Sequence, residues 1–429
     1  MIEELRRPLL CFQGWDSVFK VRCSDGLQAK AFLSHPGLSY DVLGSPELEL
    51  SCATPQTNVA VLLEHKIGGI PKKAAFVFVQ SALLYSTLTG QRRVRVSTIA
   101  LRPSTSIPDI FLSIDFSVFT TMFLRRAVAK LKELSIGKSV KETPTALQRE
   151  AKDDVLRQMV RVLASYRLYT NASNAPRGQL ILPERLQLLP LFGMCLFKSP
   201  IFRPSMGKRI GQAVLTSPTN DERAYFGFHA SMVGAAASFL LVHPNVFSIK
   251  SPLEKSVGEW RTPKRIESAQ SELIQASYHS TIQLPPTANA SMTCLDEDGV
   301  YLIDAGLVIF LSIGKEVNSD VKEELYHLPI SLSTSSINQT VTEETQRIRR
   351  IVWQMRSFCS VGTSGSRSES RPTFPPVIPV WHGDSRHLLF EQDLMNWMVD
   401  DPNGGEKDYT DFLCKLHRLI RDEIDPPKK

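Results

Sequence analysis

A run of arginines at residues 91–95 carries the clearest potential chemistry in the sequence. The run reads QRRVR, and guanidinium groups bind carboxylates and phosphates through paired hydrogen bonds. A strand here would place Arg93 and Arg95 on one face and Val94 and Val96 on the other. We expect the valines to face a core and the arginines to face outward. The arginine face either binds an anion or acidic peptide or is an ordinary solvated surface, and the pattern favours neither.

A short acidic segment offers a second kind of chemistry. Asp296, Glu297 and Asp298 precede Gly299, which resembles the start of a calcium-binding loop. The remaining ligands of a twelve-residue loop are missing from the sequence. Because short acidic segments before a glycine are common in turns, the sequence favours a solvated turn.

Cysteine and histidine spacing gives no sign of a metal site. The seven cysteines contain no C-x-x-C pair, and no two of the nine histidines stand four residues apart. An odd number of cysteines also argues against a disulfide framework and favours a reducing compartment. We therefore expect no metal and no cofactor.

Motifs for catalysis are equally scarce. The sequence has neither a phosphate-binding G-x-x-x-x-G-K-[ST] loop nor a G-x-G-x-x-G dinucleotide motif. We expect a protein that is not an enzyme. A hydrolase with a Ser, His and Asp arrangement stays open as an alternative, because such residues assemble in space. The test is whether a histidine lies within hydrogen-bond reach of a serine or cysteine and a carboxylate in a concave site.

Composition describes an ordinary globular chain. It has 429 residues, 42% hydrophobic and 22% charged, which suggests about three domains. Fifty basic against 44 acidic side chains give a net charge of +6. A dedicated nucleic-acid binder would usually show a denser basic patch, so we expect no nucleic-acid partner. Mild attraction to an anionic membrane fits this charge equally well. The longest apolar stretch, residues 232–242, is too short to span a bilayer, so we expect a cytoplasmic protein.

Residues 10–103 have the pattern of an antiparallel β-sandwich. Short β-branched and aromatic runs alternate with glycines that mark turns. Residues 82–88 and 92–99 flank Thr89 and Gly90, which predicts a β-hairpin.

Helical spacing begins after this region. Val155, Met159, Val160 and Leu163 form one apolar stripe. The pattern predicts a helical domain over residues 104–280, with a polar insertion near 251–273.

A small α/β domain follows over residues 281–395. Residues 300–313 predict a strand, a turn and a second strand, and residues 361–371 are rich in Gly and Ser and predict a flexible loop. The last segment, 396–429, contains an amphipathic helix with Phe412, Leu416 and Ile420 on its apolar face.

Several longer stretches resemble the inner subunits of the COPII vesicle coat. The sandwich region carries GWDSVFKVRCSDGL at 14–27 and ALLYSTLTGQRRVRV at 82–96. Four further stretches resemble the cargo-adaptor subunit in particular. They are QLILPERLQLLPL at 179–191, DERAY at 221–225, GVYLIDAGL at 299–307 and YTDFL at 409–413. The chain thus resembles the Sec-twenty-four family along its whole length, although Ser312 stands where the family usually has Trp.

This resemblance implies a β-sandwich, an all-helical domain and a gelsolin-like α/β domain, so the fold class is multidomain α+β. It implies a COPII coat subunit that pairs with the GTPase-activating partner subunit and binds export signals in cytosolic tails of cargo proteins. It would lie peripherally on the endoplasmic reticulum membrane and on COPII vesicles. Arg93 and Arg95, with Leu163 on the helical segment, are the candidate cargo-binding residues.

The chain begins where the family's zinc ribbon and trunk domain would end. The resemblance implies that sandwich strands from before the trunk are also missing, which would leave an unpaired sheet edge. The chain is therefore expected to be a truncated gene model, a fragment or a diverged short form. A coat-like scaffold without cargo binding is the alternative function.

Overall fold

The computed structural model of the chain divides into two units. The described residues are 11–34, 38–41, 47–71, 73–137, 144–170, 176, 179–203, 209–210, 213–214, 218–249, 254, 256–261, 281–326, 343–359, 369–371, 373–402 and 408–425. One unit comprises residues 7–205, 218–238 and 408–429, and here we call it the sandwich-helical unit. The other comprises 1–6, 206–217 and 239–407, and we call it the mixed-sheet unit.

Two antiparallel sheets form the sandwich. The larger has the order β4-β1-β6-β7 and consists of Glu47–Ala53, Gly14–Cys23, Val77–Ser86 and Arg92–Leu101. The smaller has the order β3-β2-β5 and consists of Leu38–Asp41, Leu27–Ser34 and Ala60–His65. Phe19 and Val21 of β1 pack with Phe32 of β2 and so join the sheets. The predicted β-sandwich is confirmed.

The predicted hairpin is also confirmed. Strands β6 and β7 pair in continuous antiparallel register from Val77 opposite Leu101 to Ser86 opposite Arg92. Gly90 closes the turn with a φ of 79°, which a residue with a Cβ adopts only at a cost. The amide of Gly90 donates to the carbonyl of Thr87 at 2.9 Å.

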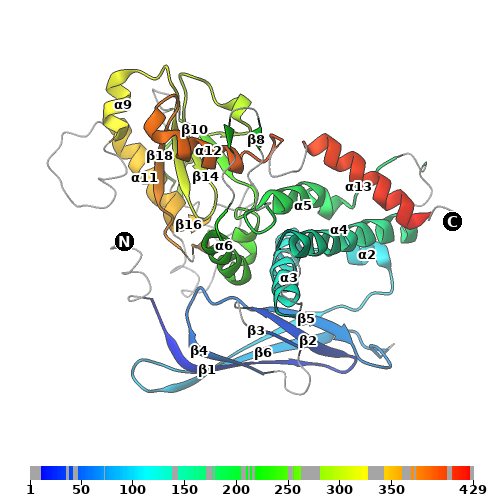
Figure 1. Cartoon of the computed structure of the whole chain (residues 1–429). Coiled ribbons are helices and arrows are strands. Elements are labelled where there is room, and N and C mark those ends of the chain that lie inside the picture. The colour runs from blue at the N-terminus through cyan, green and yellow to red at the C-terminus, as the bar shows by residue number, and fades with distance from the viewer. Residues whose placement is uncertain are drawn as a thin grey trace. The chain divides into compact units, whose positions relative to one another are not determined.

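Helices make up the rest of the sandwich-helical unit (Figure 1). They are α2 (Ile107–Leu112), α3 (Phe116–Gly137), α4 (Pro144–Tyr169), η2 (Glu184–Leu186), α5 (Leu189–Lys198), α6 (Asn220–Met232), α7 (Ala235–Ser238) and α13 (Tyr409–Ile424). The predicted apolar stripe of α4 is confirmed, because Val155, Met159, Val160 and Leu163 are all buried.

Helix α6 begins at the DERAY motif for physical reasons that the structure shows. Thr219 and Glu222 form a reciprocal capping box at its N-terminus. Arg223 points back and donates to the carbonyl oxygens of Pro200 at 3.1 Å and Arg203 at 2.8 Å. The motif therefore starts a helix and fixes the segment that follows α5.

The C-terminal helix α13 is part of the helical domain, which corrects the separate segment predicted for 396–429. Its buried side chains Phe412, Leu416 and Ile420 pack with α4 and α5. Phe412 also contacts the ring of Phe197 in α5 at a centroid distance of 6.0 Å. The sequence did not predict this packing, because the apolar stripe of α13 does not show which distant helices it will contact.

The mixed-sheet unit is built on a five-stranded sheet. Its order is β13-β10-β14-β15-β18, with strands Thr287–Ala288, Asn245–Ile249, Val300–Asp304, Ile309–Ile313 and Val377–Trp381. Among the described strand pairs of this sheet, only β15 and β18 run parallel. Since β10 lies next to β14, the helical domain ends near residue 238, which corrects the predicted boundary at 280.

Helices α9 (Ser319–Tyr326), α11 (Glu343–Ser357) and α12 (Leu388–Trp397) belong to this unit. Buried Ile348, Ile351, Val352 and Met355 of α11 join the core of the sheet. Short pieces complete the unit: β8 (Arg209–Ile210), β9 (Ala213–Val214), β11 (Trp260–Arg261), β12 (Thr281–Ile282), η3 (Met292–Cys294), β16 (Phe358–Cys359), β17 (Glu369–Ser370) and η4 (Ser385–His387).

The loop predicted at 361–371 needs a partial correction. Residues 361–368 lie outside the described residues, but 369–370 form a strand, and Arg371 is buried. Arg371 makes a buried ion pair with Asp304 and donates to the carbonyl of Gly306 at 3.3 Å. The arginine therefore anchors the end of this segment to the turn between β14 and β15.

Candidate functional site

Arg93 and Arg95 lie on β7, on the opposite face of the sheet from the one predicted. In the antiparallel register Arg95 stands opposite Leu83, and Leu83 stands opposite Phe19. Directly paired residues project to the same side of a sheet, and Phe19 is on the side that packs on the smaller sheet. The arginines therefore share the inner face, and Val94 and Val96 share the outer one.

The predicted burial of the valines is wrong. Val94 is 61% exposed and Val96 54% exposed, and all ten residues of β7 are exposed. The reason is that the valines project from the face turned away from the smaller sheet, on a strand that is also the edge of its own sheet. Ile99, which shares the inner face with the arginines, is 59% exposed. Alternation was predicted correctly, but it does not say which face is covered.

The two arginines differ in their partners. Arg93 donates to the side-chain oxygen of Gln91 at 2.7 Å. Arg95 has no hydrogen bond or ion pair with any residue that the structure describes. Their neighbour Arg92 is engaged on the outer face by Asp16 and Ser86. Of these three arginines, Arg95 is therefore best placed to donate hydrogen bonds to an external anion.

The third predicted residue, Leu163, is not at a surface. It lies in the middle of α4 and is 1% exposed. A peptide could reach its side chain only by opening the helical core. The structure therefore corrects the candidate site, which keeps Arg93 and Arg95.

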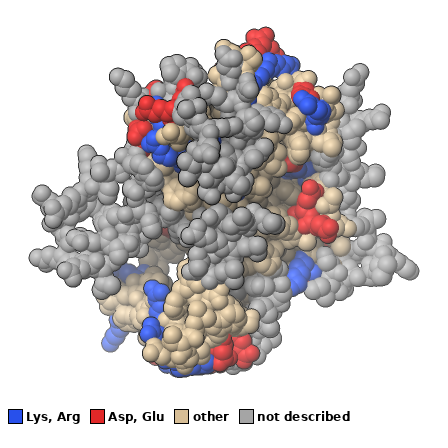
Figure 2. Space-filling model, turned by 90° about the vertical axis from the view of Figure 1, so that its left-hand side faces the viewer, with Lys and Arg blue, Asp and Glu red and all other residues tan. Residues whose placement is uncertain are grey.

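On the sandwich, basic side chains lie close to acidic ones. On the face shown in Figure 2, described Lys and Arg side chains are interspersed with Asp and Glu. Lys20 on β1, for example, pairs with Glu47 on β4. Recognition of an anion at β7 would therefore depend on direct contact with a guanidinium more than on a long-range field.

A buried arginine that the sequence did not predict as functional joins the sandwich to the helices. Arg125 of α3 is 2% exposed, and its guanidinium donates to the carbonyls of Leu33 at 2.6 Å and Val233 at 2.7 Å. It also donates to the side-chain oxygen of Asn58 at 2.8 Å. Burial lowers the pKa of Arg125 to about 10, so the group stays charged at neutral pH. No sequence motif marks this contact.

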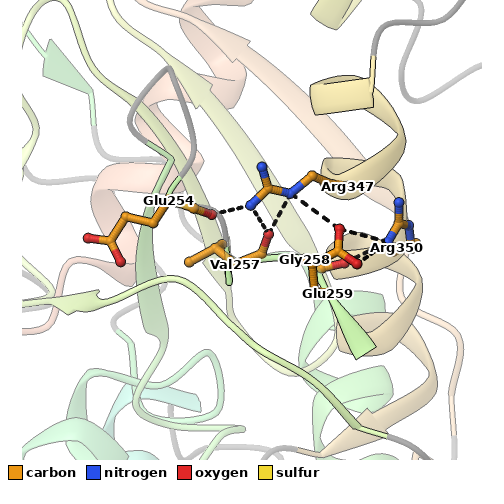
Figure 3. Close-up of polar contacts among 6 residues, drawn as sticks. All are labelled: Glu254, Val257, Gly258, Glu259, Arg347 and Arg350. Carbon is orange, nitrogen blue, oxygen red and sulfur yellow. Dashed lines mark hydrogen bonds and ion pairs between the residues drawn. The ribbon is translucent and has the colours of Figure 1, made fainter. Parts of the chain in front are cut away.

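A second arginine cluster lies in the mixed-sheet unit (Figure 3), and the sequence did not predict it either. The Nε of Arg347 in α11 donates to the carbonyl of Val257 at 2.7 Å. Its Nη2 donates to the carbonyl of Glu254. Arg350, one turn later, donates to the carbonyl of Gly258 at 3.1 Å and contacts Glu259 at 3.2 Å. The pair fixes part of the polar insertion predicted near 251–273. Residues 251–253, 255 and 262–273 of that insertion lie outside the described residues.

A Ser, His and Glu arrangement does occur in the mixed-sheet unit. His382 lies 2.8 Å from the Ser312 hydroxyl through Nε2 and 2.9 Å from the Glu391 carboxylate through Nδ1. His382 borders a pocket of about 420 Å³, but neither Ser312 nor Glu391 lines it.

Access argues against catalysis by this arrangement. Ser312 is 1% exposed within β15, so a substrate cannot reach its hydroxyl. The three residues instead connect β15, the end of β18 and α12. The geometry therefore gives the hydrolase alternative no support.

The acidic segment forms the predicted turn. The amide of Gly299 donates to the carbonyl of Asp296 at 3.0 Å, and the Tyr301 hydroxyl donates to the Asp296 carboxylate at 3.1 Å. Among the described residues, no three His, Cys, Asp or Glu side chains cluster as metal ligands would. None of the helices described is both long and apolar enough to cross a bilayer.

Comparison with known proteins agrees with the two domains of the sandwich-helical unit. Residues 14–104 match the family model of the Sec23/Sec24 beta-sandwich domain, and residues 115–238 match that of the Sec23/Sec24 helical domain. Together the two matches span half of the chain.

Individual relatives extend the similarity over nearly all residues. The chain is 25% identical to human protein transport protein Sec24C over 98% of its own length and 32% of that protein. It is 24% identical to Arabidopsis thaliana protein transport protein SEC24 A over 97% and 35%. The chain thus spans about a third of the length of these relatives.

A solved structure shows the same fold. The crystal structure of the human COPII-coat protein Sec24c matches with a TM-score of 0.69 at 23% identity. The match covers 99% of this chain and 46% of the crystallised one.

Proposed function

This chain belongs to the Sec23/Sec24 family, and on that premise we propose that it serves as a COPII coat subunit that binds acidic export signals in cargo tails. The names of its relatives support the coat role. The observation that carries cargo binding is the open inner face of β7, where Arg93 and Arg95 are exposed. Its partners would be the GTPase-activating coat subunit, cargo tails and the anionic surface of the endoplasmic reticulum membrane.

The chemistry of this face suits an extended acidic peptide. Two guanidinium groups spaced two residues apart along a strand match carboxylates spaced in the same way on a neighbouring extended chain. Leu83, which is partly exposed, lies on the same face and directly opposite Arg95 in the register. A bound peptide could therefore combine acidic and apolar contacts. Weak binding of this kind would gain strength from the many copies in a coat.

The experiment is a peptide titration with a paired mutation. Changing Arg93 and Arg95 together to Ala should weaken binding of a fluorescent acidic tail peptide by about 1 to 3 kcal/mol, because charge-assisted hydrogen bonds are lost. Anisotropy measures the affinity. Added salt should weaken wild-type binding, since exposed charges are screened. Arg95→Lys should also lose affinity if the contact is bidentate.

A matched control removes two exposed arginines elsewhere in the same unit. Arg22 lies on the outer face of β1, and Arg126 lies on the exposed side of α3. Changing both to Ala should leave affinity unchanged. Equal affinity of the folded Arg93/Arg95 variant and wild type would refute cargo binding at β7 and favour the coat-like scaffold without cargo binding.

A further inference from the structure

We propose that a pocket between α4 and α13 docks a short linear peptide in which a large apolar side chain is followed by an acidic residue. The pocket lies within the sandwich-helical unit, has a volume of about 260 Å³ and is formed by the last turn of α4, residues 179–181 and the second half of α13. It shares no residue with the β7 face. The inference therefore does not depend on the proposed cargo site or on the coat role.

The floor of the pocket is apolar because a buried stripe reaches solvent there. On α13, Phe412, Leu416 and Ile420 are buried, and the next residue on the same face, Ile424, is only partly covered. Leu168 at the end of α4 is 45% exposed. Leu180 and Ile181 complete the apolar lining. An apolar side chain placed here would continue the core of the helical domain.

The rim favours an acidic neighbour for that side chain. Arg167, His417 and Arg421 line the pocket together with a single carboxylate, Asp425. Arg167 is buried in the wall, where it donates to the carbonyl of Pro176 at 2.7 Å. Arg421 is exposed, and its Nη2 lies 3.6 Å from Asp422. Its remaining donors can reach a ligand carboxylate at the mouth.

Helix polarity sets how that carboxylate must bind. Both α4 and α13 end at this pocket, and the carbonyl end of a helix carries partial negative charge. Arg167 and Arg421, each in the last turn of its helix, offset this charge. The long-range field is therefore weak, and an acidic residue gains only by direct contact with a guanidinium.

Size limits the class of ligand. A volume of about 260 Å³ lies below the usual range of roughly 300 to 1,000 Å³ for small-molecule sites. It holds one or two side chains rather than a cofactor. A short peptide motif, whose main chain stays outside the pocket, fits this limit better than a nucleotide or a metabolite.

Three synthetic peptides test the proposal on the full chain. The probe is a fluorescein-labelled, amidated Gly-Ser-Leu-Phe-Asp-Glu-Ser-Gly; in the second peptide Lys-Lys replaces Asp-Glu, and in the third Ser-Ser replaces Leu-Phe. We expect the first to bind at least about fivefold more tightly than either of the others, because each lacks one of the two contacts. Equal binding of all three would overturn the proposal.

The position of the bound peptide can be read from isoleucine methyl groups. With ¹³C-labelled isoleucine δ1 methyls, the first peptide should shift the signals of Ile181, Ile420 and Ile424, which line the pocket. Ile309, in the core of the mixed-sheet unit, should not move. Shifts confined to residues outside the pocket would overturn the proposal.

Two variants separate the pocket from other basic surfaces. Arg421→Glu should weaken binding of the first peptide by about fivefold or more, whereas Arg418→Glu, exposed on α13 but not lining the pocket, should leave it unchanged. The Arg93/Arg95 double alanine variant should also bind normally. If that variant loses this peptide while Arg421→Glu retains it, the peptide binds at β7, and the pocket proposal fails by itself.

Discussion

At the scale of single residues, the main feature is Arg125, a buried charged side chain whose hydrogen-bond partners include no carboxylate. Arg125 is surrounded by main-chain carbonyls and an amide oxygen from β2, the segment before β5 and the end of α6. These acceptors come from both the sandwich and the helices. The arginine therefore holds the two layers of this unit in register, at the cost of desolvating its charge.

Replacing this arginine tests its role. Arg125→Met should lower the stability of the sandwich-helical unit by about 2 to 4 kcal/mol, because three or more buried acceptors lose their donor. The readout is the midpoint of thermal or urea unfolding. Arg126→Met, at the exposed neighbouring position, should change it little. If both variants unfolded at the same midpoint, the contacts of Arg125 would contribute nothing net.

A partly buried histidine predicts how stability depends on pH. Burial lowers the pKa of His243 from its ordinary value of 6.5, and nearby Asp400 opposes this only partly. The unfolded chain therefore binds a proton at higher pH than the folded one, so this contribution to stability is complete above about pH 6.5 and is lost as the pH falls below it. Unfolding midpoints between pH 7.5 and pH 5 should show the decline. His243→Gln should make the decline shallower, and an unchanged slope would contradict this assignment.

At the scale of elements, one glycine decides whether α11 can pack on its neighbouring segment. Gly258 has a φ of 79°, and a Cβ placed on it would lie 2.7 Å from the Cβ of Arg347. The same residue accepts a hydrogen bond from Arg350. The close approach of the main chain to α11 is what lets both arginines reach their acceptors.

Gly90 provides a matched comparison for this site. It has the same φ of 79° in the β6–β7 turn, but nothing lies within 4 Å of an added Cβ. Gly90→Ala should cost about 1 to 2 kcal/mol from the left-handed backbone alone. Gly258→Ala should cost about 1 to 3 kcal/mol more, from the clash with Arg347. Equal losses in melting experiments would show that α11 moves aside freely.

At the scale of the whole molecule, the open edge of the larger sheet is the main liability. Strand β7 is exposed along its full length, and its outer face presents Val94 and Val96. Uncovered edge strands with apolar side chains pair readily with other chains. We therefore expect the isolated protein to associate through this edge.

Charged substitutions at the edge test that expectation. Changing Val94 and Val96 to Lys should reduce association measured by light scattering, because lysines on an edge strand oppose pairing. The same double change at Leu112 and Val118, exposed on helices α2 and α3, should have little effect. A wild-type protein that stays monomeric at high concentration would count against self-association through β7.

Local periodicity determined much of this protein from the sequence alone. The β6–β7 hairpin, the buried stripe of α4 and the apolar face of α13 each follow from spacing within a few residues, because local geometry fixes which side chains share a face. Long motifs were sufficient to identify the family. Tertiary structure decided what each face meets. Whether the arginine face of β7 was covered, whether Leu163 reached the surface, and which carbonyls Arg125 and Arg347 would bind all depend on residues far away in the chain. These contacts are set by packing between elements, which no local pattern records.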